Sequence, residues 1–378
     1  MEREQSILEV LVMPAKSDPL NKYQGKTVLV TGDTGFKGSW LSLWLSLLGA
    51  NVVGYSLPVK NPEDNYSVCG LDDIVHHVDG DVRDEATILR VMKKHEPEMI
   101  FHLAAQALVL DSLKDPRYTF ETNIMGTVNV FEAARRSKQV KAIVNVTSDK
   151  CYENVEWSHG YRETDRLGGK DPYSASKGAA EIVSSSYART FFDKKDSAAV
   201  ATVRAGNVIG GGDWAANRIV PDCIRALQSS LPIRIRNPDA VRPWQHVLDP
   251  LYGYLRLGAF LMDGEKRYSG AWNFGPAHHS VISVKRLVEE VIDHWGTGGY
   301  VVDEEPTSHE AGFLQLDISK SVKELAWYPL MDFPLAVKRT VEEYRIGDRP
   351  KRKVRQQRLR HIREYMDRRK RFERERYG

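Results

Sequence analysis

Cysteine is scarce in this sequence of 378 residues. Cys69, Cys151 and Cys223 are odd in number and far apart, which excludes a disulfide scaffold and a clustered zinc site. Long apolar runs are also lacking. The run at 7–13 is too short and wrongly flanked for a signal peptide or a membrane span. We therefore expect a cytoplasmic protein with reduced thiols, no membrane partner and no metal.

The sequence also lacks a strong overall charge, but its positive and negative residues are distributed unevenly along the chain. Its 54 Lys and Arg against 51 Asp and Glu give a net charge of +3. Residues 349–378 hold 14 of these cations and 4 of the anions, a net of +10, so the remainder carries −7. With 42% apolar and 28% charged residues, disorder is excluded. No nucleic-acid partner is expected, because no binding fold accompanies the basic tail.

Strand-like and helix-like segments alternate over the first two hundred residues. This alternation predicts an α/β fold, a Rossmann-like doubly wound parallel sheet with a smaller C-terminal substrate-binding lobe. The expected strands are 26–30, 50–55, 76–78, 99–103, 140–147 and 198–203. The expected helices are 39–48, 86–95, 123–137, 173–192, 249–261 and 284–294.

The domain organisation follows from where this pattern weakens. Residues 1–22 are interpreted as an extension, and 23–206 as the dinucleotide-binding domain, with 246–275 returning to it. Residues 207–245 and 276–346 form the lobe, and 347–378 a basic helical tail. Leu359, Ile362 and Met366 lie on one helical stripe of that tail. A solvated helix or a frayed arm is the simplest interpretation of the tail, followed by contact with another subunit or acidic partner.

A glycine-rich turn, TGDTGFKG at 31–38, follows the first strand and opens a helix. Glycines at 32, 35 and 38 permit a tight turn, close approach of a pyrophosphate and helix–strand packing. The alternative is a glycine-rich connection without a ligand. The second strand ends in Tyr55-Ser56-Leu57, without the usual carboxylate and without an arginine for a 2′-phosphate. NAD is therefore favoured over NADP. Asp81 and Val82 are candidate adenine contacts or an ordinary loop.

Two polar groups of residues predict the chemistry. Tyr173 and Lys177 are four residues apart at the start of a helix, so both lie on one face, and a nearby ammonium favours the phenolate. Ser148, Asp149 and Lys150 follow a strand, where open α/β sheets bind ligands. A hydroxyl, an acid and an amine there offer a donor, a general acid and a general base. The alternatives are an exposed helix pair and a helix cap or turn.

Taken together, these motifs resemble a known family. From about residue 23 to about 344 the chain is similar to the nucleotide-sugar 4,6-dehydratases of the extended short-chain dehydrogenase/reductase superfamily, above all to the type that acts on CDP-glucose. The segments that carry the resemblance are TGDTGFKGSW at 31–40, FHLAAQ at 101–106, TSDKCYE at 147–153, GYRE at 160–163, GGKDPYSASK at 168–177, RAGNVIGGGDWAANRIVPD at 204–222 and RPWQHVL at 242–248.

The resemblance implies a redox-neutral lyase using tightly bound NAD. The C4 hydroxyl of CDP-glucose is oxidised, water leaves across C5 and C6, and the hydride returns to C6, giving CDP-4-keto-6-deoxy-D-glucose. Tyr173 would take the C4 hydroxyl proton, Lys177 would hold the nicotinamide ribose and Ser148 would bond the C4 oxygen. Asp149 would protonate the departing C6 hydroxyl, and Lys150 would act at the C5 proton. Such products supply deoxyhexoses of cell-surface polysaccharide, including O-antigen.

The resemblance also assigns binding residues. The expected cofactor contacts are Gly32, Gly35, Phe36, Gly38, Asp81, Val82, Ala104, Ala105, Asn123, Thr147, Tyr173 and Lys177. The expected substrate contacts are Asn207, Arg218 and Arg242, for which a surface salt bridge is the alternative for each arginine. His102 is expected to be a core or supporting histidine. A homodimer or homotetramer is expected, with the helices that begin at Asn123 and Tyr173 at the interface.

Two other functions remain open. One is another sugar-nucleotide enzyme of the same superfamily, either a 4,6-dehydratase for a different nucleotide or an epimerase. The other is a non-catalytic dinucleotide-binding protein. An epimerase would not need the acid–base pair Asp149 and Lys150, and the intact Tyr173 and Lys177 speak against a protein without catalysis.

Overall fold

A central parallel sheet organises the protein. The computed structural model describes residues 18–59, 61–277, 281–303 and 314–377. Within these ranges the sheet has seven strands in the order β11-β6-β5-β4-β1-β2-β3, all paired in parallel. The strands are β1 Thr27–Thr31, β2 Asn51–Ser56, β3 His76–Asp79, β4 Met99–His102, β5 Ala142–Val146, β6 Ala199–Arg204 and β11 Gly270–Asn273. The predicted doubly wound sheet is confirmed.

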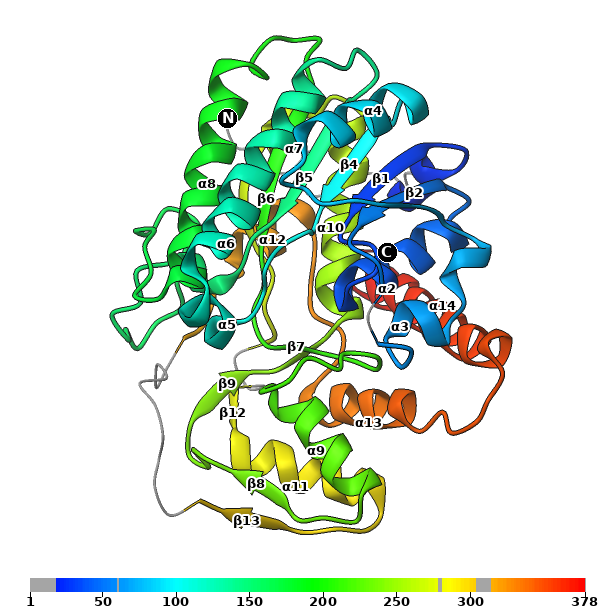
Figure 1. Ribbon diagram of the computed structural model, residues 1–378, viewed down its shortest axis with the longest axis vertical. Coiled ribbons are helices and arrows are strands. Elements are labelled where there is room, and N and C mark those ends of the chain that lie inside the picture. The colour runs from blue at the N-terminus through cyan, green and yellow to red at the C-terminus, as the bar shows by residue number, and fades with distance from the viewer. Residues whose placement is uncertain (1–17, 60, 278–280, 304–313, 378) are drawn as a thin grey trace.

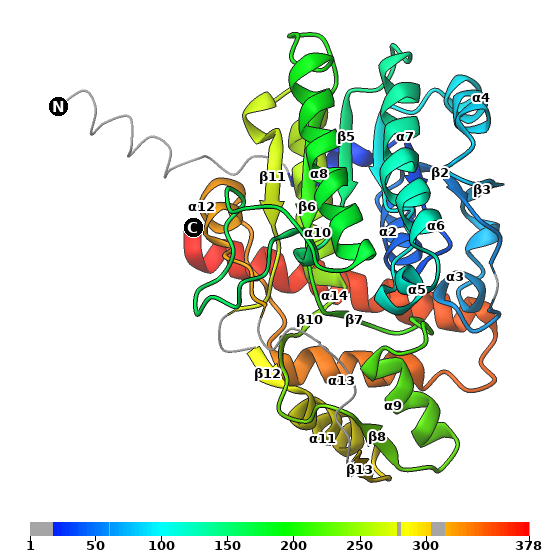
Figure 2. The same cartoon turned by 60° about the vertical axis from the view of Figure 1, so that its left-hand side comes forward.

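Helices cover both faces of this sheet (Figures 1 and 2). One face packs on α4 (Glu85–His95), α7 (Gly126–Arg135) and α8 (Pro172–Thr190), through a cluster that includes Leu29, Ile100 and Phe131. The other packs on α2 (Phe36–Leu47) and α10 (Leu248–Met262), through Trp40, Trp44 and Leu255. Because strand side chains alternate between faces, neighbours such as Leu29 and Val30 enter different clusters.

The lobe lies beyond the carboxyl ends of the strands (Figure 1). It pairs β8 (Ile233–Ile235) with β13 (Tyr300–Val302), and β9 (Val241–Pro243) with β12 (Val281–Ser283). A third pair joins β7 (Val208–Ile209) to β10 (Gln245–His246) where the chain leaves and re-enters the larger domain. The helices α9 (Ile219–Gln228), α11 (Val284–Trp295) and α13 (Phe333–Tyr344) pack together around these ribbons.

The long helices were predicted better than the short ones. The segments expected at 249–261 and 284–294 are α10 and α11. The segment expected at 123–137 is divided into a π-helical turn, Glu121–Met125, and α7. Sequence reasoning missed α3 (Asn65–Val68), α5 (Val109–Lys114), α6 (Pro116–Phe120), α9, α12 (Ser319–Leu325) and α13. Most of these are too short to show a full apolar period.

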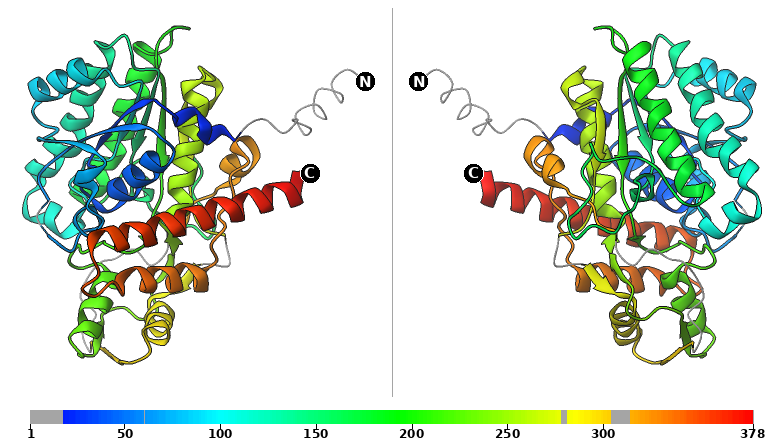
Figure 3. Two further views of the ribbon diagram at one scale, coloured as in Figure 1. Left: turned by 90° about the vertical axis from the view of Figure 1, so that its right-hand side faces the viewer. Right: turned by 90° about the vertical axis from the view of Figure 1, so that its left-hand side faces the viewer.

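The basic tail is not a solvated arm, and that prediction is wrong. Residues Lys351–Tyr377 form one helix, α14, which passes along α2, α3 and α13 (Figure 3). Val354, Ile362 and Tyr365 are at most 2% exposed. The tail was expected to be solvated because its cations dominate its composition, but its apolar and aromatic side chains form a stripe that packs on the body.

The first turn also belongs to the body. Of the extension expected at 1–22, residues 1–17 lie outside the described part of the chain. Pro19–Tyr23 form a 3₁₀ turn against α10. Leu20 and Tyr23 are buried there, and the Tyr23 hydroxyl donates to the Leu255 carbonyl over 2.8 Å. In the part of the chain described, no helix is long and apolar enough to cross a membrane.

Candidate functional site

The glycine-rich turn between β1 and α2 has the shape that a diphosphate requires. Gly32 has a φ of +74°, which a side chain rarely adopts. An added Cβ there would lie 2.7 Å from the Ala104 amide nitrogen, and one on Gly38 would lie 2.0 Å from the Gly32 carbonyl oxygen. Among the described side chains none caps the N-terminus of α2. Its amide groups therefore remain available to an anion, and these residues fit a dinucleotide.

A buried carboxylate of the glycine-rich turn, Asp33, lies behind the end of β2, where the usual acidic residue is missing. Ser56 donates to Asp33 Oδ1 over 2.9 Å and lies 2.8 Å from the Thr34 hydroxyl. His77 Nδ1 lies 2.8 Å from Asp33 Oδ2, and this hydrogen bond raises the pKa of His77. Sequence reasoning missed this group because its members come from β2, β3 and the turn. Asp81, the predicted adenine contact, forms an ion pair with Arg83.

Other predicted cofactor residues are partly or fully buried and contact other parts of the protein. Val82 is buried, and Ala104 and Ala105 are half-buried. Phe36 is half-buried in the core on the lobe side of the turn. Asn123 is buried, accepts from the Gln106 amide over 2.8 Å and donates to the Gln106 carbonyl over 2.9 Å.

Asn123 also donates to Ser176 on α8, so it holds the segment after β4 against that helix. His102 is a buried core histidine, as expected, between the Thr31 and Thr127 hydroxyls. Burial lowers the pKa of His102 to about 3, so it is neutral.

The structure brings four of the predicted catalytic side chains together. Asp171 caps α8 by accepting from the Ser174 amide, and Pro172 occupies its first turn, which fixes the next residue, Tyr173, at the helix start. Lys177 lies one turn later and donates to the Val146 carbonyl at the end of β5 over 3.3 Å. Both side chains are less than 9% exposed. Tyr173 and Lys177 therefore face the carboxyl end of the sheet.

Ser148 and Asp149 complete this group. Ser148 donates to Asp149 Oδ1 over 3.0 Å and accepts from the Lys150 amide, so it also caps the 3₁₀ turn Asp149–Cys151. The Asp149 carboxylate is 3% exposed. It lies directly over Gly206, where an added Cβ would be 1.8 Å from Oδ2. Sequence reasoning did not explain this glycine, whose role depends on β6 running beside β5.

Electrostatics distinguish the two members of the Tyr-Lys pair. Burial raises the pKa of Tyr173 to about 12, while its hydrogen bond with Ser148 and the charge of Arg218 act in the opposite direction. Burial, then the neighbouring charge of Lys37, lowers the pKa of Lys177 to about 8. The pKa of Lys37 is also about 8, because of burial and the charge of Arg218. Lys37, which sequence reasoning passed over, thus belongs to the site.

A buried ion pair, Arg204 with Glu181, lies beside the end of β5 that carries the site. Arg204 donates to both carboxylate oxygens of Glu181, over 2.9 and 2.8 Å, and both side chains are 3% exposed. The same carboxylate accepts from the hydroxyls of Thr147 and Thr202. Despite burial, these hydrogen bonds and the charge of Arg204 hold the pKa of Glu181 below its usual value. Thr147, a predicted cofactor contact, therefore turns its hydroxyl into the fold.

The remaining predicted catalytic and substrate-binding residues are less buried than this catalytic group. The Lys150 side chain is exposed. Asn207 has a φ of +50°, and its carbonyl accepts from the Gln245 amide, next to the strand that carries Arg242. Arg242 is half-buried on β9. Arg218 pairs with Asp213 over 2.7 Å.

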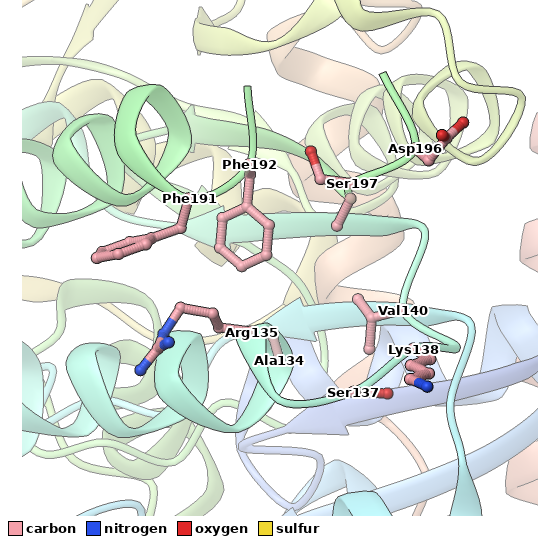
Figure 4. Close-up of a pocket in the computed structure, with 10 residues that line it drawn as sticks. Ala134, Arg135, Ser137, Lys138, Val140, Phe191, Phe192, Asp196 and Ser197 are labelled. Atoms are coloured by element: carbon pink, nitrogen blue, oxygen red, sulfur yellow. The ribbon is translucent and has the colours of Figure 1, made fainter. Parts of the chain in front are cut away.

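A separate hollow lies at the other end of the sheet (Figure 4). About 280 Å³ in volume, it is bounded by the ends of α7 and α8, with Arg135, Lys138 and Phe192 among its lining. The predicted catalytic residues follow the carboxyl ends of the strands, whereas this hollow adjoins their amino ends. Among the described residues no cluster of three side chains could hold a metal ion.

Comparison with known proteins agrees with this geometry. A family model described as GDP-mannose 4,6 dehydratase matches residues 29–340. The chain belongs to this family. It is 45% identical over 314 residues to a CDP-glucose 4,6-dehydratase of Salmonella typhimurium, which covers 82% of this chain and 88% of that protein. It is 30% identical over 330 residues to a dTDP-glucose 4,6-dehydratase of Streptomyces antibioticus, with coverages of 84% and 92%.

Solved structures give the same picture of the fold. A Thermus thermophilus UDP-glucose 4-epimerase in complex with NAD has a TM-score of 0.73 and 26% identity, and covers 85% of this chain and all of that one. A dTDP-glucose 4,6-dehydratase of Streptomyces venezuelae with NAD bound has a TM-score of 0.69 and 25% identity, with coverages of 85% and 97%. Dehydratases and epimerases share this architecture, so the choice between them depends on the site.

Proposed function

We propose that this protein is a CDP-glucose 4,6-dehydratase that uses NAD. The observation that carries the proposal is the buried Asp149 carboxylate, hydrogen-bonded to Ser148 in the group that contains Tyr173. A 4-epimerase needs a hydroxyl, a tyrosine and a lysine, and a dehydratase needs an acid for the leaving hydroxyl as well. The 45% identity to the Salmonella enzyme supports CDP-glucose as the substrate.

In this proposal each side chain holds or moves one proton. Bound NAD would supply the hydride acceptor for C4 and the hydride donor for C6. Tyr173 takes the proton of the C4 hydroxyl, and Ser148 donates a hydrogen bond to the same oxygen. Lys177 bonds the cofactor ribose, and its positive charge favours the phenolate. Asp149 protonates the departing C6 hydroxyl, and Lys150 acts at the C5 proton.

The glycine-rich turn and Ala104 and Ala105 would surround the cofactor diphosphate. The carboxylate of Asp33 behind Ser56 supports NAD over NADP, because a 2′-phosphate there would meet negative charge. Asn207, Arg218 and Arg242 would bind the substrate diphosphate, as amide and guanidinium donors do.

Incubation with CDP-glucose and, in parallel, with dTDP- and GDP-sugars tests the proposal. A 4-keto-6-deoxy product absorbs in alkali and shows a C6 methyl signal in the proton NMR spectrum, which we expect from CDP-glucose. If no sugar nucleotide yields a methyl signal, the dehydratase proposal is wrong. A stereoisomer formed without loss of water would support the epimerase. Asp149→Asn should slow elimination more than C4 oxidation, so bound NADH or a 4-keto-glucose should accumulate.

We also propose a homodimer or homotetramer that works in the cytoplasm. Leu113, Met125 and Ile182, on α5, the π-helical turn and α8, are 58%, 50% and 61% exposed. Large apolar side chains exposed on elements that pack together indicate an interface. Three buried free cysteines suit a reducing compartment.

A further inference from the structure

The basic C-terminal helix, α14, is attached to the body by polar side chains as well as by its apolar stripe. Arg358 and His361 are at most 2% exposed. Arg358 donates to the Glu343 carbonyl over 2.6 Å, and His361 Nδ1 lies 2.9 Å from Glu343 Oε1. Burying such groups is unfavourable unless each finds a partner. Two buried polar contacts of α14 therefore meet at Glu343, at the end of α13 and just beyond the family match that ends at 340.

Glu343 connects that helix to a loop of the lobe. Its Oε2 accepts from the Gly211 amide over 2.8 Å and lies 3.3 Å from His246 Nε2. Burial alone would raise the pKa of Glu343, but His246, His361 and Arg358 hold it well below the usual value, so the carboxylate is ionised. An added Cβ on Gly211 would lie 2.3 Å from the Glu343 Cβ. Only glycine permits this close approach.

The loop is held at two further points. The Gly211 carbonyl accepts from Trp40 Nε1 over 3.0 Å, and the Asp213 carbonyl accepts from the Tyr344 hydroxyl. The Asp213 carboxylate, 9% exposed, pairs with Arg218 Nη1 over 2.7 Å. The guanidinium charge of Arg218 is close enough to Tyr173 to lower its pKa. Arg218 therefore reaches toward the catalytic group from a loop whose backbone is held by α2 and α13.

We propose that Glu343, held by the C-terminal helix, is a positioning residue that fixes the 211–213 loop and thereby aims Arg218 at the diphosphate of the substrate. The inference rests on the proposed function, in which Arg218 binds that diphosphate. It gives the basic tail a role: its buried face holds Glu343, while its exposed cations remain in solvent.

The test compares Glu343→Gln with Arg218→Ala in the full-length protein. Glutamine keeps the shape but loses the charge and one acceptor, so we expect KM for CDP-glucose to rise about tenfold, the effect of one charged hydrogen bond. Because the contact is made in the ground state and the transition state alike, kcat should change little. The Kd for NAD, measured by calorimetry, should stay within about twofold, since no hydrogen bond to the cofactor is lost. Glu375→Gln, at an exposed position near the end of α14, is the matched control and should change none of these values.

A double mutant distinguishes positioning from general destabilisation. If Glu343 acts through Arg218, the KM of the double variant Glu343→Gln/Arg218→Ala should exceed the wild-type KM by less than the product of the two single-variant increases. A rise equal to that product would overturn the inference. The inference would also be overturned if Arg218→Ala raises KM but Glu343→Gln leaves it unchanged. In that case the proposed function would still stand. An unchanged KM in Arg218→Ala would refute the role of Arg218 in the proposed function, and the inference with it.

A milder substitution covers the case in which Glu343→Gln does not fold. Tyr344→Phe removes only the hydroxyl that donates to the Asp213 carbonyl. It should raise KM about threefold, because one neutral hydrogen bond is lost. A KM unchanged in Tyr344→Phe would then overturn the inference.

Discussion

Replacing Gly206 by alanine should disable Asp149 while leaving the neighbouring catalytic side chains in place. The new Cβ would lie 1.8 Å from Asp149 Oδ2, whereas ordinary contact begins near 3.4 Å. The carboxylate must therefore move by about 1.6 Å, and misplacement of a reacting group by 1 Å costs roughly 100-fold in rate. We expect kcat for dehydration to fall by about 100-fold, or about 2.7 kcal/mol of barrier.

The assay for Gly206→Ala separates oxidation from elimination. The absorbance of the reduced cofactor reports C4 oxidation, and the alkaline absorbance of the 4-keto-6-deoxy product reports the complete reaction. Reduced cofactor should accumulate on the variant, as on Asp149→Asn. Gly275→Ala is the control, since its Cβ would meet Ile318 at an ordinary 3.4 Å. A folded Gly206→Ala with nearly normal turnover would refute the assignment of Asp149 as the acid.

Three further predictions use other parts of the structure. We expect the alkaline limb of the kcat/KM profile near pH 8, where Lys177 loses its proton. Lys37→Met removes a positive charge that lowers the pKa of Lys177, so this limb should move to higher pH. A limb that does not move would contradict the coupling between the two lysines. Glu181→Gln leaves Arg204 buried without its counter-ion and should lower the free energy of unfolding in urea by roughly 3–5 kcal/mol; a loss below about 1 kcal/mol would match only a surface pair. Ile182→Glu should shift the mass measured by light scattering toward the monomer, and an unchanged mass would place the interface elsewhere.

Stability should also depend on pH through the buried lysines. Lys177 has a pKa of about 8 in the folded protein, below the ordinary value of 10.5 for a lysine. Between these two values the unfolded chain binds more protons, so this residue makes stability rise with pH across that window. Lys37 has the same sign. Lys177→Met should flatten this rise in urea unfolding measured between pH 8 and 10.

The sequence alone determined six of the seven described strands of the sheet, the glycine-rich turn and the Tyr173–Lys177 pair. Each is a local pattern: a run of apolar residues that forms a buried strand, glycines at spacing three, or two side chains four residues apart on a helix. Strand ends could be predicted as the place of the site, because parallel strands end at one edge of the sheet. Ser148 and Asp149 followed from that rule.

Only the tertiary structure decided which groups support these residues. The partners of Asp33, Glu181 and Glu343 lie 15 to 132 residues away along the chain and on other elements, so no local pattern joins them. The basic tail shows the same limit. Its composition predicted a solvated helix, but burial depends on whether another surface presents the carboxylates and carbonyls that its inward-facing cations require. Glu343 is such a partner. It meets Arg358 and His361 only because α13 and α14 lie side by side in the folded protein.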